Sequence, residues 1–128
     1  MKNFSYIFFA LIATFFVACS GSDTYQGEWK ATNNQGSKYT LNFSPKELSI
    51  KDSTGKSVKY GYTQNSIKIS NGIKNYGINL KDGRKYTITF PISKDETKAY
   101  LSGGNGKTVY TLSRNSYISQ DDLYQLTD

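Results

Sequence analysis

The sequence predicts an all-β domain that closes into a small antiparallel barrel. Tyrosine is frequent, with 11 residues in a chain of 128, and aromatic residues favour strands. Apolar and polar residues alternate with a period of two through most of the chain, which is typical of strands buried on one face. Turn sequences such as Asn71-Gly72 and Asp82-Gly83 separate these runs. A long meander with one apolar face must curl until that face meets itself, so we expect a closed or nearly closed barrel.

The alternating runs define the strands in chain order. We expect eight or nine of them, at residues 27–31, 38–43, 47–51, 56–63, 66–70, 73–80, 84–93, 98–102 and 107–114. Pro91 lies late in its run, so that strand is expected to bulge or to end near an edge. The aromatic residues expected to point inward are Tyr39, Phe43, Tyr60, Tyr62, Tyr76, Tyr86, Phe90 and Tyr110.

The C-terminal tail, residues 116–128, is acidic and differs from the body of the chain. Ser119 precedes Asp122 at the spacing of a helix N-cap, and Leu123 and Leu126 follow three residues apart. This pattern predicts a short C-terminal helix. The alternative is a frayed C-terminus.

The N-terminal residues 1–18 have the character of an export signal. Lys2 is followed by an apolar run and by the small residue Ala18, directly before Cys19, the single cysteine of the chain. The segment Phe16-Val17-Ala18-Cys19 resembles the lipobox of bacterial lipoproteins. This resemblance implies cleavage before Cys19 and acylation of its thiol. The alternatives are an ordinary signal peptide with a chance cysteine, or an uncleaved membrane anchor.

The lipoprotein resemblance predicts where the protein works and how the chain is divided. Ser20 follows Cys19, and in lipoproteins the absence of an aspartate there favours the outer membrane. We expect a lipidated, flexible tether over residues 19–25, a barrel over 26–115 and the acidic tail behind it. A monomer is expected.

Two further residues suggest a barrel family. Gly27-Glu28-Trp29 opens the first strand and resembles the G-x-W motif of the lipocalins and the wider calycin group. In that group the tryptophan closes one end of the barrel, and an arginine late in the last strand lies across it. The resemblance implies this role for Trp29 and Arg114, through a cation–π contact. The alternative for Trp29 is ordinary core packing.

The composition offers little reactive chemistry. The chain has no histidine, which is the common proton shuttle at neutral pH and the commonest metal ligand. Its one cysteine is expected to carry lipid. Asp52 and Asp82 lie where turns favour aspartate, and Asp95 and Glu96 are adjacent in an expected turn. We therefore expect no enzyme activity, no catalytic residues, no metal site and no cofactor.

The chain is basic, which can indicate nucleic-acid binding. The net charge is +6, and basic aromatic barrels can bind single strands. Export and the inward placement of the aromatic residues argue against a nucleic-acid partner.

The most glycine-dense stretch is a candidate binding loop. It comprises Ser102, Gly103, Gly104, Asn105, Gly106 and Lys107, directly before the last strand. An early G-x-W with a late glycine loop that runs into a V-Y-x-x-x-R strand resembles the staphostatins, small lipocalin-like inhibitors of secreted papain-type cysteine proteases. In that family the loop lies in the protease cleft, which implies this role for Gly103, Gly104 or Gly106. The alternative is a flexible hairpin with no partner.

These observations lead to three hypotheses, all of them non-enzymatic. The first in rank is a protein-binding or inhibitor module of the cell envelope, with a secreted cysteine protease as its specific partner. The second is a lipocalin-like carrier of a small hydrophobic ligand. The inward aromatic rings argue against a deep ligand cavity, because they fill much of the interior of an eight-strand barrel. The third is an accessory or immunity lipoprotein that docks to a larger envelope assembly.

Overall fold

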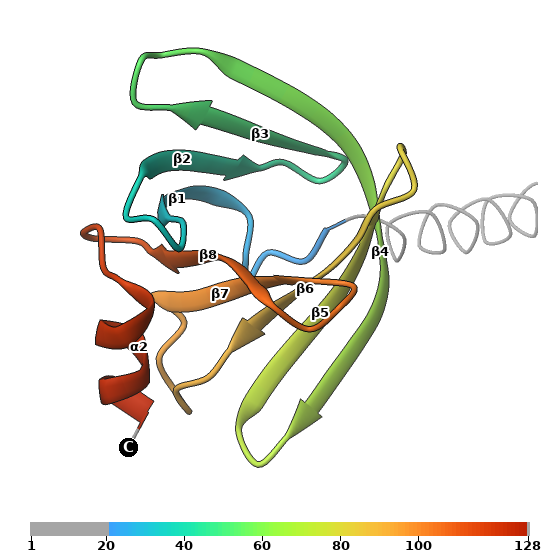
Figure 1. The fold of residues 1–128 in the computed structure, drawn as a ribbon. Coiled ribbons are helices and arrows are strands. Elements are labelled where there is room, and N and C mark those ends of the chain that lie inside the picture. Colours follow the sequence, from blue (N-terminus) through green and yellow to red (C-terminus); the bar gives the residue numbers. More distant parts are fainter. Residues whose placement is uncertain (1–20, 128) are drawn as a thin grey trace, which may run out of the picture.

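The computed structural model describes residues 21–127, and Cys19 and the signal segment 1–18 lie outside the described residues. Eight antiparallel strands form one closed barrel in simple sequence order (Figure 1). The strands are β1 Gly27–Thr32, β2 Lys38–Phe43, β3 Glu47–Asp52, β4 Ser57–Ser70, β5 Ile73–Leu80, β6 Lys85–Phe90, β7 Lys98–Gly103 and β8 Thr108–Ser113. The barrel closes where β1 pairs with β8, with Ala31 opposite Leu112. The predicted all-β meander barrel is therefore confirmed.

The long strand β4 differs from the prediction of two strands at 56–63 and 66–70. It continues through the polar residues between them, and the register with β5 shifts between Gln64 and Ser66. A bulge of this kind inserts one extra residue and bends the strand. The first half of β4 therefore pairs with β3, while its second half pairs with β5 alone.

Pro91 ends its strand rather than bulging within it. Strand β6 stops at Phe90, directly before the proline, because proline has no N–H to continue a ladder. The expected strand 84–93 is therefore shorter at its C-terminal end.

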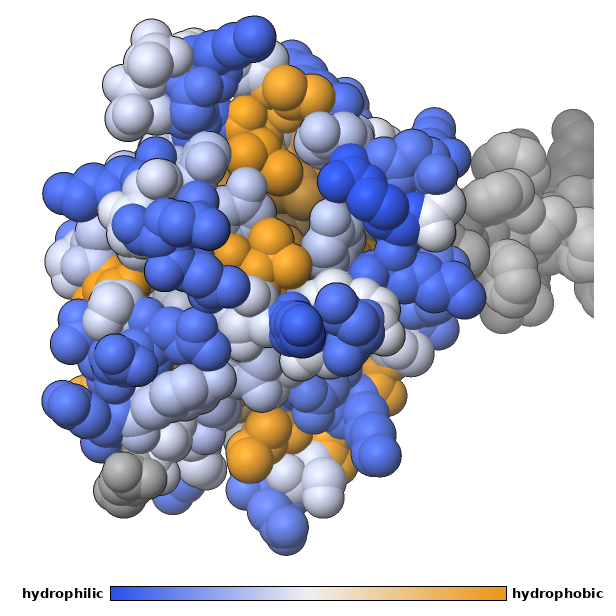
Figure 2. Space-filling model, viewed as in Figure 1, coloured by the Kyte–Doolittle hydropathy of each residue, from blue (hydrophilic) through white to orange (hydrophobic). Residues whose placement is uncertain are grey.

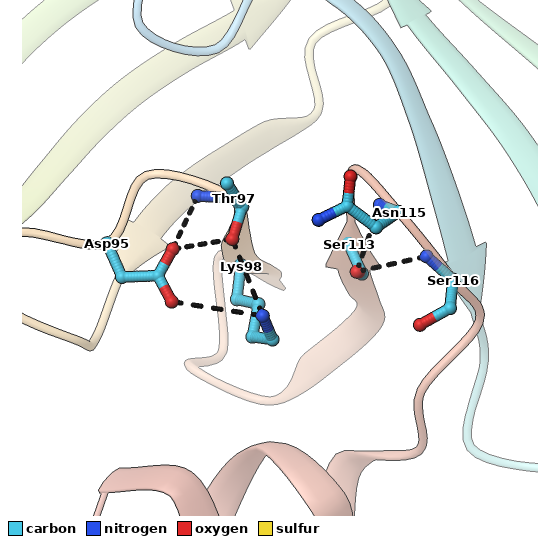
Figure 3. A network of polar contacts seen from close by, with 6 residues as sticks. All are labelled: Asp95, Thr97, Lys98, Ser113, Asn115 and Ser116. Atoms are coloured by element: carbon cyan, nitrogen blue, oxygen red, sulfur yellow. Dashed lines mark hydrogen bonds and ion pairs between the residues drawn. The ribbon is translucent and has the colours of Figure 1, made fainter.

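Polar contacts order the chain on either side of β7 and β8 (Figure 3). Asp95 accepts hydrogen bonds from the backbone N–H of Thr97, at 2.9 Å, and from its hydroxyl, at 2.5 Å. The Thr97 hydroxyl and N–H hold the pKa of the Asp95 carboxyl below its usual value. The hydroxyl of Ser113 accepts longer bonds from the N–H groups of Asn115 and Ser116, at 3.4 and 3.5 Å. These contacts fix how the chain enters β7 and leaves β8.

The predicted C-terminal helix is present as α2, Gln120–Thr127. The hydroxyl of Ser119 accepts a 3.1 Å bond from the Asp122 N–H, and the Asp122 carboxylate accepts a 3.1 Å bond from the Ser119 N–H. This reciprocal pair satisfies two donors at the helix start. Leu123 is buried, whereas Leu126 is about half exposed at 52%, so one turn of the helix anchors it to the barrel.

One end of the barrel is closed by the residues that precede β1. Tyr25 is fully buried and packs with its ring centroid 5.3 Å from that of Phe43 and 5.2 Å from that of Tyr76. The backbone N–H of Gly21 donates to the carbonyl of Pro45, at 2.8 Å, in the turn between β2 and β3. The flexible tether expected over residues 19–25 is thus not observed at 21–25, which are fastened to the barrel. We call this the closed end.

Trp29 and Arg114 lie together at the closed end. The Arg114 guanidinium is 3.7 Å from the centroid of the Trp29 ring. Arg114 also donates to the backbone carbonyls of Glu28, at 3.0 Å, and Gln26, at 2.9 Å. Burial lowers the pKa of Arg114, but a guanidinium remains charged at neutral pH. This residue therefore joins the last strand to the segment that plugs the barrel.

Candidate functional site

The opposite end of the barrel, which we call the open end, carries four hairpin turns. They connect β1 to β2, β3 to β4, β5 to β6 and β7 to β8, at residues 33–37, 53–56, 81–84 and 104–107. No segment equivalent to residues 21–25 covers this end among the described residues. The side chains that point inward near these turns are therefore the ones that a partner or ligand can reach.

Four tyrosines surround the open end: Tyr39, Tyr60, Tyr86 and Tyr110. All four are half-buried and pack against the buried core. The rings of Tyr39 and Tyr110 meet edge to face, with centroids 5.2 Å apart, which is a favourable aromatic geometry. Burial raises the pKa of Tyr110, and the neighbouring phenol of Tyr39 adds to the effect. Its hydroxyl is therefore neutral at physiological pH.

Arg84 lies among these rings. Its guanidinium is 4.7 Å from the centroid of Tyr60 and 5.8 Å from that of Tyr86. Asp82 holds it in place, with Nε donating to Oδ2 at 2.9 Å. The Asp82 carboxylate and the Tyr60 hydroxyl raise the pKa of Arg84. The result is a cation stacked on two aromatic rings, with its charge already balanced by a carboxylate.

A hollow of about 200 Å³ lies between these side chains. Its lining is mostly apolar and consists of Leu48, Ile50, Val58, Tyr60, Leu80, Arg84, Tyr86, Leu101, Val109 and Tyr110. In the space-filling view, apolar side chains gather in a depression between hydrophilic ones, over the upper half of the face shown (Figure 2). The open end therefore combines an apolar floor with a tyrosine rim. We call it the tyrosine mouth.

The hollow does not continue through the barrel. Below it the interior is packed with buried side chains, of which the aromatic ones are Tyr25, Trp29, Phe43, Tyr62, Tyr76 and Phe90. An eight-stranded barrel is just wide enough for side chains to fill. The geometry therefore provides a shallow mouth and no deep central cavity.

The predicted binding loop borders the tyrosine mouth. Ser102 and Gly103 belong to β7, and the turn itself spans residues 104–107. The N–H of Gly103 donates to the carbonyl of Lys107 at 2.9 Å, and the N–H of Gly106 donates to the carbonyl of Gly103 at 2.9 Å. Gly106 has a positive φ of 81°, which glycine adopts without strain. This is a tight, internally bonded turn rather than a long protruding loop.

The side chain of Asn105 adds one more bond, because its Oδ1 accepts from the N–H of Lys107 at 3.0 Å. Directly after the turn, Val109 and Tyr110 line the hollow. The turn 104–107 and the tyrosine mouth therefore form one continuous surface.

The residues singled out from the sequence do not form a single site. Trp29 and Arg114 belong to the closed end, and the 102–107 segment belongs to the open end. Sequence reasoning missed Arg84 as part of the mouth, although it directly follows the predicted Asp82-Gly83 turn. Within residues 21–127, no three His, Cys, Asp or Glu side chains are grouped so that they could hold a metal ion. In the same range, no helix has the length and apolar character needed to cross a bilayer.

A scan against protein-family models gives no match for this chain, and a search of curated proteins gives no relative of significant similarity. The geometry of the two barrel ends is therefore the basis for the functional conclusion.

Proposed function

We propose that this protein is a non-enzymatic binding module of the cell envelope that recognises a protein partner through its open end. The observation that carries the proposal is the tyrosine mouth: four half-buried tyrosines and a stacked arginine around an apolar hollow. Tyrosine and arginine are enriched at the energetic centres of protein interfaces. Tyrosine supplies large contact area at low entropic cost, because its side chain has few rotatable bonds.

The size of the hollow favours a protein partner over a small molecule. Sites for drug-sized ligands enclose roughly 300–1,000 Å³, whereas this hollow encloses about 200 Å³. Such a volume suits one apolar side chain of a partner that otherwise rests on the rim. The four hairpin turns of the open end, including 104–107, form the outer part of this rim.

The best specific partner remains a secreted papain-type cysteine protease. The tight turn 104–107 supports a rigid inhibitory contact, because a preorganised loop loses little conformational entropy on binding. Gly104 is the exposed glycine of this turn that can be varied without strain, because its φ is not positive and a Cβ atom there would meet nothing closer than 3.9 Å. Gly106 has a different role, because its positive φ maintains the turn.

The lipid anchor proposed at Cys19 fits this direction of binding. Gly21 lies at the closed end, on the turn between β2 and β3. Acylation two residues earlier in the chain would hold the closed end next to the membrane and point the tyrosine mouth away from it. This arrangement leaves the open end accessible to a partner, at the outer membrane if Ser20 acts as the sorting residue.

A second candidate is a lipocalin-like carrier, which the closed eight-strand architecture is consistent with. The specific observation in its favour is the apolar lining by Leu48, Ile50, Val58 and Val109. The shallow volume and the pairing of Arg84 with Asp82 weaken it, because an anionic head group would have to compete with a carboxylate already in place.

The experiment compares two surface variants of the purified full-length chain. Gly104→Arg places a bulky side chain on the rim, and Asn115→Arg adds the same charge beyond β8 at the closed end. With papain as the probe protease, we expect inhibition by the wild type and by Asn115→Arg, and loss of inhibition in Gly104→Arg. The same variants serve in affinity enrichment from envelope and secreted fractions.

Palmitate is the probe for the carrier. Trp29 lies at the closed end, so its fluorescence is a poor reporter of the mouth, and NMR signals of the tyrosine rings are followed instead. If palmitate shifts the NMR signals of Tyr60, Tyr86 and Tyr110 and no protein is enriched, the carrier function replaces the protein-binding function. Absence of any effect of Gly104→Arg on papain and on enriched proteins would remove the role of the open end.

A further inference from the structure

Strand β4 is longer than its neighbours and leaves one edge of the sheet unpaired. Its pairing with β3 covers residues 57–61 and ends with a bond from the Tyr62 N–H to the Lys46 carbonyl at 3.0 Å. Beyond the bulge, in which Asn65 has no partner, residues 66–70 pair with β5 on one side. Among residues 21–127 no strand pairs with their other side. Figure 1 shows this half of β4 running along the outer margin of the barrel wall.

This free edge, residues 65–70 of β4, presents unpaired backbone donors and acceptors to solvent, and all six residues are exposed. Natural proteins protect such edges with proline, charges, bulges or short strands. Here the bulge lies at the beginning of the segment, and Lys68 is the one charged residue within it. The remaining residues form a regular, accessible template for another strand.

The two faces of the free edge differ in character. Ile67 and Ile69 lie on the inner face, because Ile67 is directly opposite the buried Tyr76. They are exposed by 55% and 60%, respectively. In Figure 2 apolar side chains appear at the bottom of the molecule, where Figure 1 places the turn between β4 and β5. This is apolar surface on a strand that has room for a partner.

The outer face of the free edge is polar. Ser66, Lys68 and Ser70 point to this side, and they border an open trough of about 570 Å³. Gly77 forms part of its lining, and the Ser66 hydroxyl lies so close to Gly77 that a Cβ atom there would be 2.3 Å from it. A neighbouring strand would therefore meet isoleucines on one face and a lysine among hydroxyl groups on the other.

We propose that the free edge is a strand-addition site for an extended segment of a partner protein. Main-chain hydrogen bonds supply affinity in this mode of recognition, and alternate side chains supply specificity. The partner's segment carries apolar residues that cover Ile67 and Ile69, and acidic residues that face Lys68. A second copy of this chain is a poorer occupant, because antiparallel self-pairing would bring the two Lys68 side chains together on one face. The site lies past the bulge, away from the tyrosine mouth, and does not depend on the role of the mouth.

The test uses a short synthetic peptide of alternating valine and glutamate, added to the full-length chain and followed through backbone amide NMR signals. We expect shifts confined to the free edge and its β5 partners. The double variant Ile67→Thr, Ile69→Thr should weaken binding roughly tenfold, because two cross-strand pairs contribute together about 1.4 kcal/mol. Lys68→Glu should reverse the preference towards a valine–lysine peptide.

Leu126→Thr is the matched control, because it also removes an exposed apolar side chain and should leave peptide affinity unchanged. A valine–glutamate peptide with N-methylated backbone should fail to bind, since it cannot complete the ladder. Equal binding of the methylated peptide, shifts at the tyrosine mouth instead of the free edge, or equal affinity for the two charge patterns would overturn the proposal. Dimerisation of the wild-type chain that Ile67→Thr abolishes would also overturn it, by assigning the edge to a second copy.

Discussion

The hydroxyl of Tyr25 donates a 2.7 Å hydrogen bond to Oε1 of Gln64. This contact joins the segment before β1 to the bulge of β4, across 39 positions of the sequence. Ser22 donates to the same oxygen from its backbone N–H, at 3.1 Å, and from its hydroxyl, at 2.7 Å. The closed end and the bend of β4 are therefore held by one acceptor, which links the plug of the barrel to the start of the free edge.

Replacement of Tyr25 should destabilise the whole barrel. Tyr25→Ala removes a fully buried ring and should lower the free energy of unfolding by about 3–5 kcal/mol. Tyr25→Phe keeps the ring and loses the bond to Gln64, so a loss of about 1 kcal/mol is expected. Urea unfolding measures both, with the exposed Tyr124→Ala as a control that should change stability by less than about 0.5 kcal/mol. Equal effects of Tyr25→Ala and Tyr124→Ala would contradict the role of Tyr25 as a plug.

Arg114→Lys tests the closing contact with Trp29. Lysine keeps the charge but loses the planar fork that stacks on the indole and reaches several carbonyls at once. The expected loss of unfolding free energy is about 1–3 kcal/mol. Arg84→Lys is the same substitution at the exposed open end and should cost less than about 1 kcal/mol. A smaller effect at Arg114 than at Arg84 would show that the contact with Trp29 contributes little.

Alkaline pH should destabilise the fold through its buried tyrosines. Burial is the main cause that raises the pKa of Tyr25 and of Tyr62. A raised folded-state pKa means that the stabilisation is complete below the unfolded-state pKa of about 10 and is lost as pH rises above it. Urea unfolding between about pH 8 and pH 11 should therefore show a decline that Tyr62→Phe reduces. A wild-type curve that stays flat across this range would contradict the prediction.

The two glycines of the 104–107 turn should respond differently to alanine. Gly106→Ala places a side chain at a φ of 81° and should cost about 1–2 kcal/mol of stability. Gly104→Ala meets no close atom and should change stability by less than about 0.5 kcal/mol. Thermal unfolding of the two variants provides the measurement. It also determines whether lost binding in a Gly104 variant reflects the surface rather than the fold.

Ser119→Ala should loosen α2 without unfolding the barrel. The substitution removes the acceptor for the Asp122 N–H and should cost the helix about 0.5–2 kcal/mol. Amide hydrogen exchange should become faster in residues 120–127 and stay unchanged in β4. Faster exchange throughout the barrel would instead show that α2 supports the whole fold.

The sequence determined the class of the fold, because side-chain alternation and turn residues act locally. The alternation of Tyr86, Ile88 and Phe90 with threonine and lysine specifies a one-sided strand wherever it lies in a sheet. Pro91 indicated an interruption of that strand through its missing N–H, but only the structure showed that the strand ends at Phe90. The spacing of Ser119 and Asp122 likewise specified the start of α2.

Only the tertiary structure decided how deeply each inward side chain is buried. Alternation places Tyr62 and Tyr60 in the same period-two comb, yet Tyr62 is buried by the residues before β1 and Tyr60 lines the mouth. The position of a ring along the barrel axis depends on which strands are neighbours and in what register, and no local pattern encodes it. For the same reason the sequence did not indicate that Tyr25 closes one end of the barrel or that Arg84 stacks on Tyr60 at the other. Nor did it indicate that β4 extends beyond β3 and leaves an edge free.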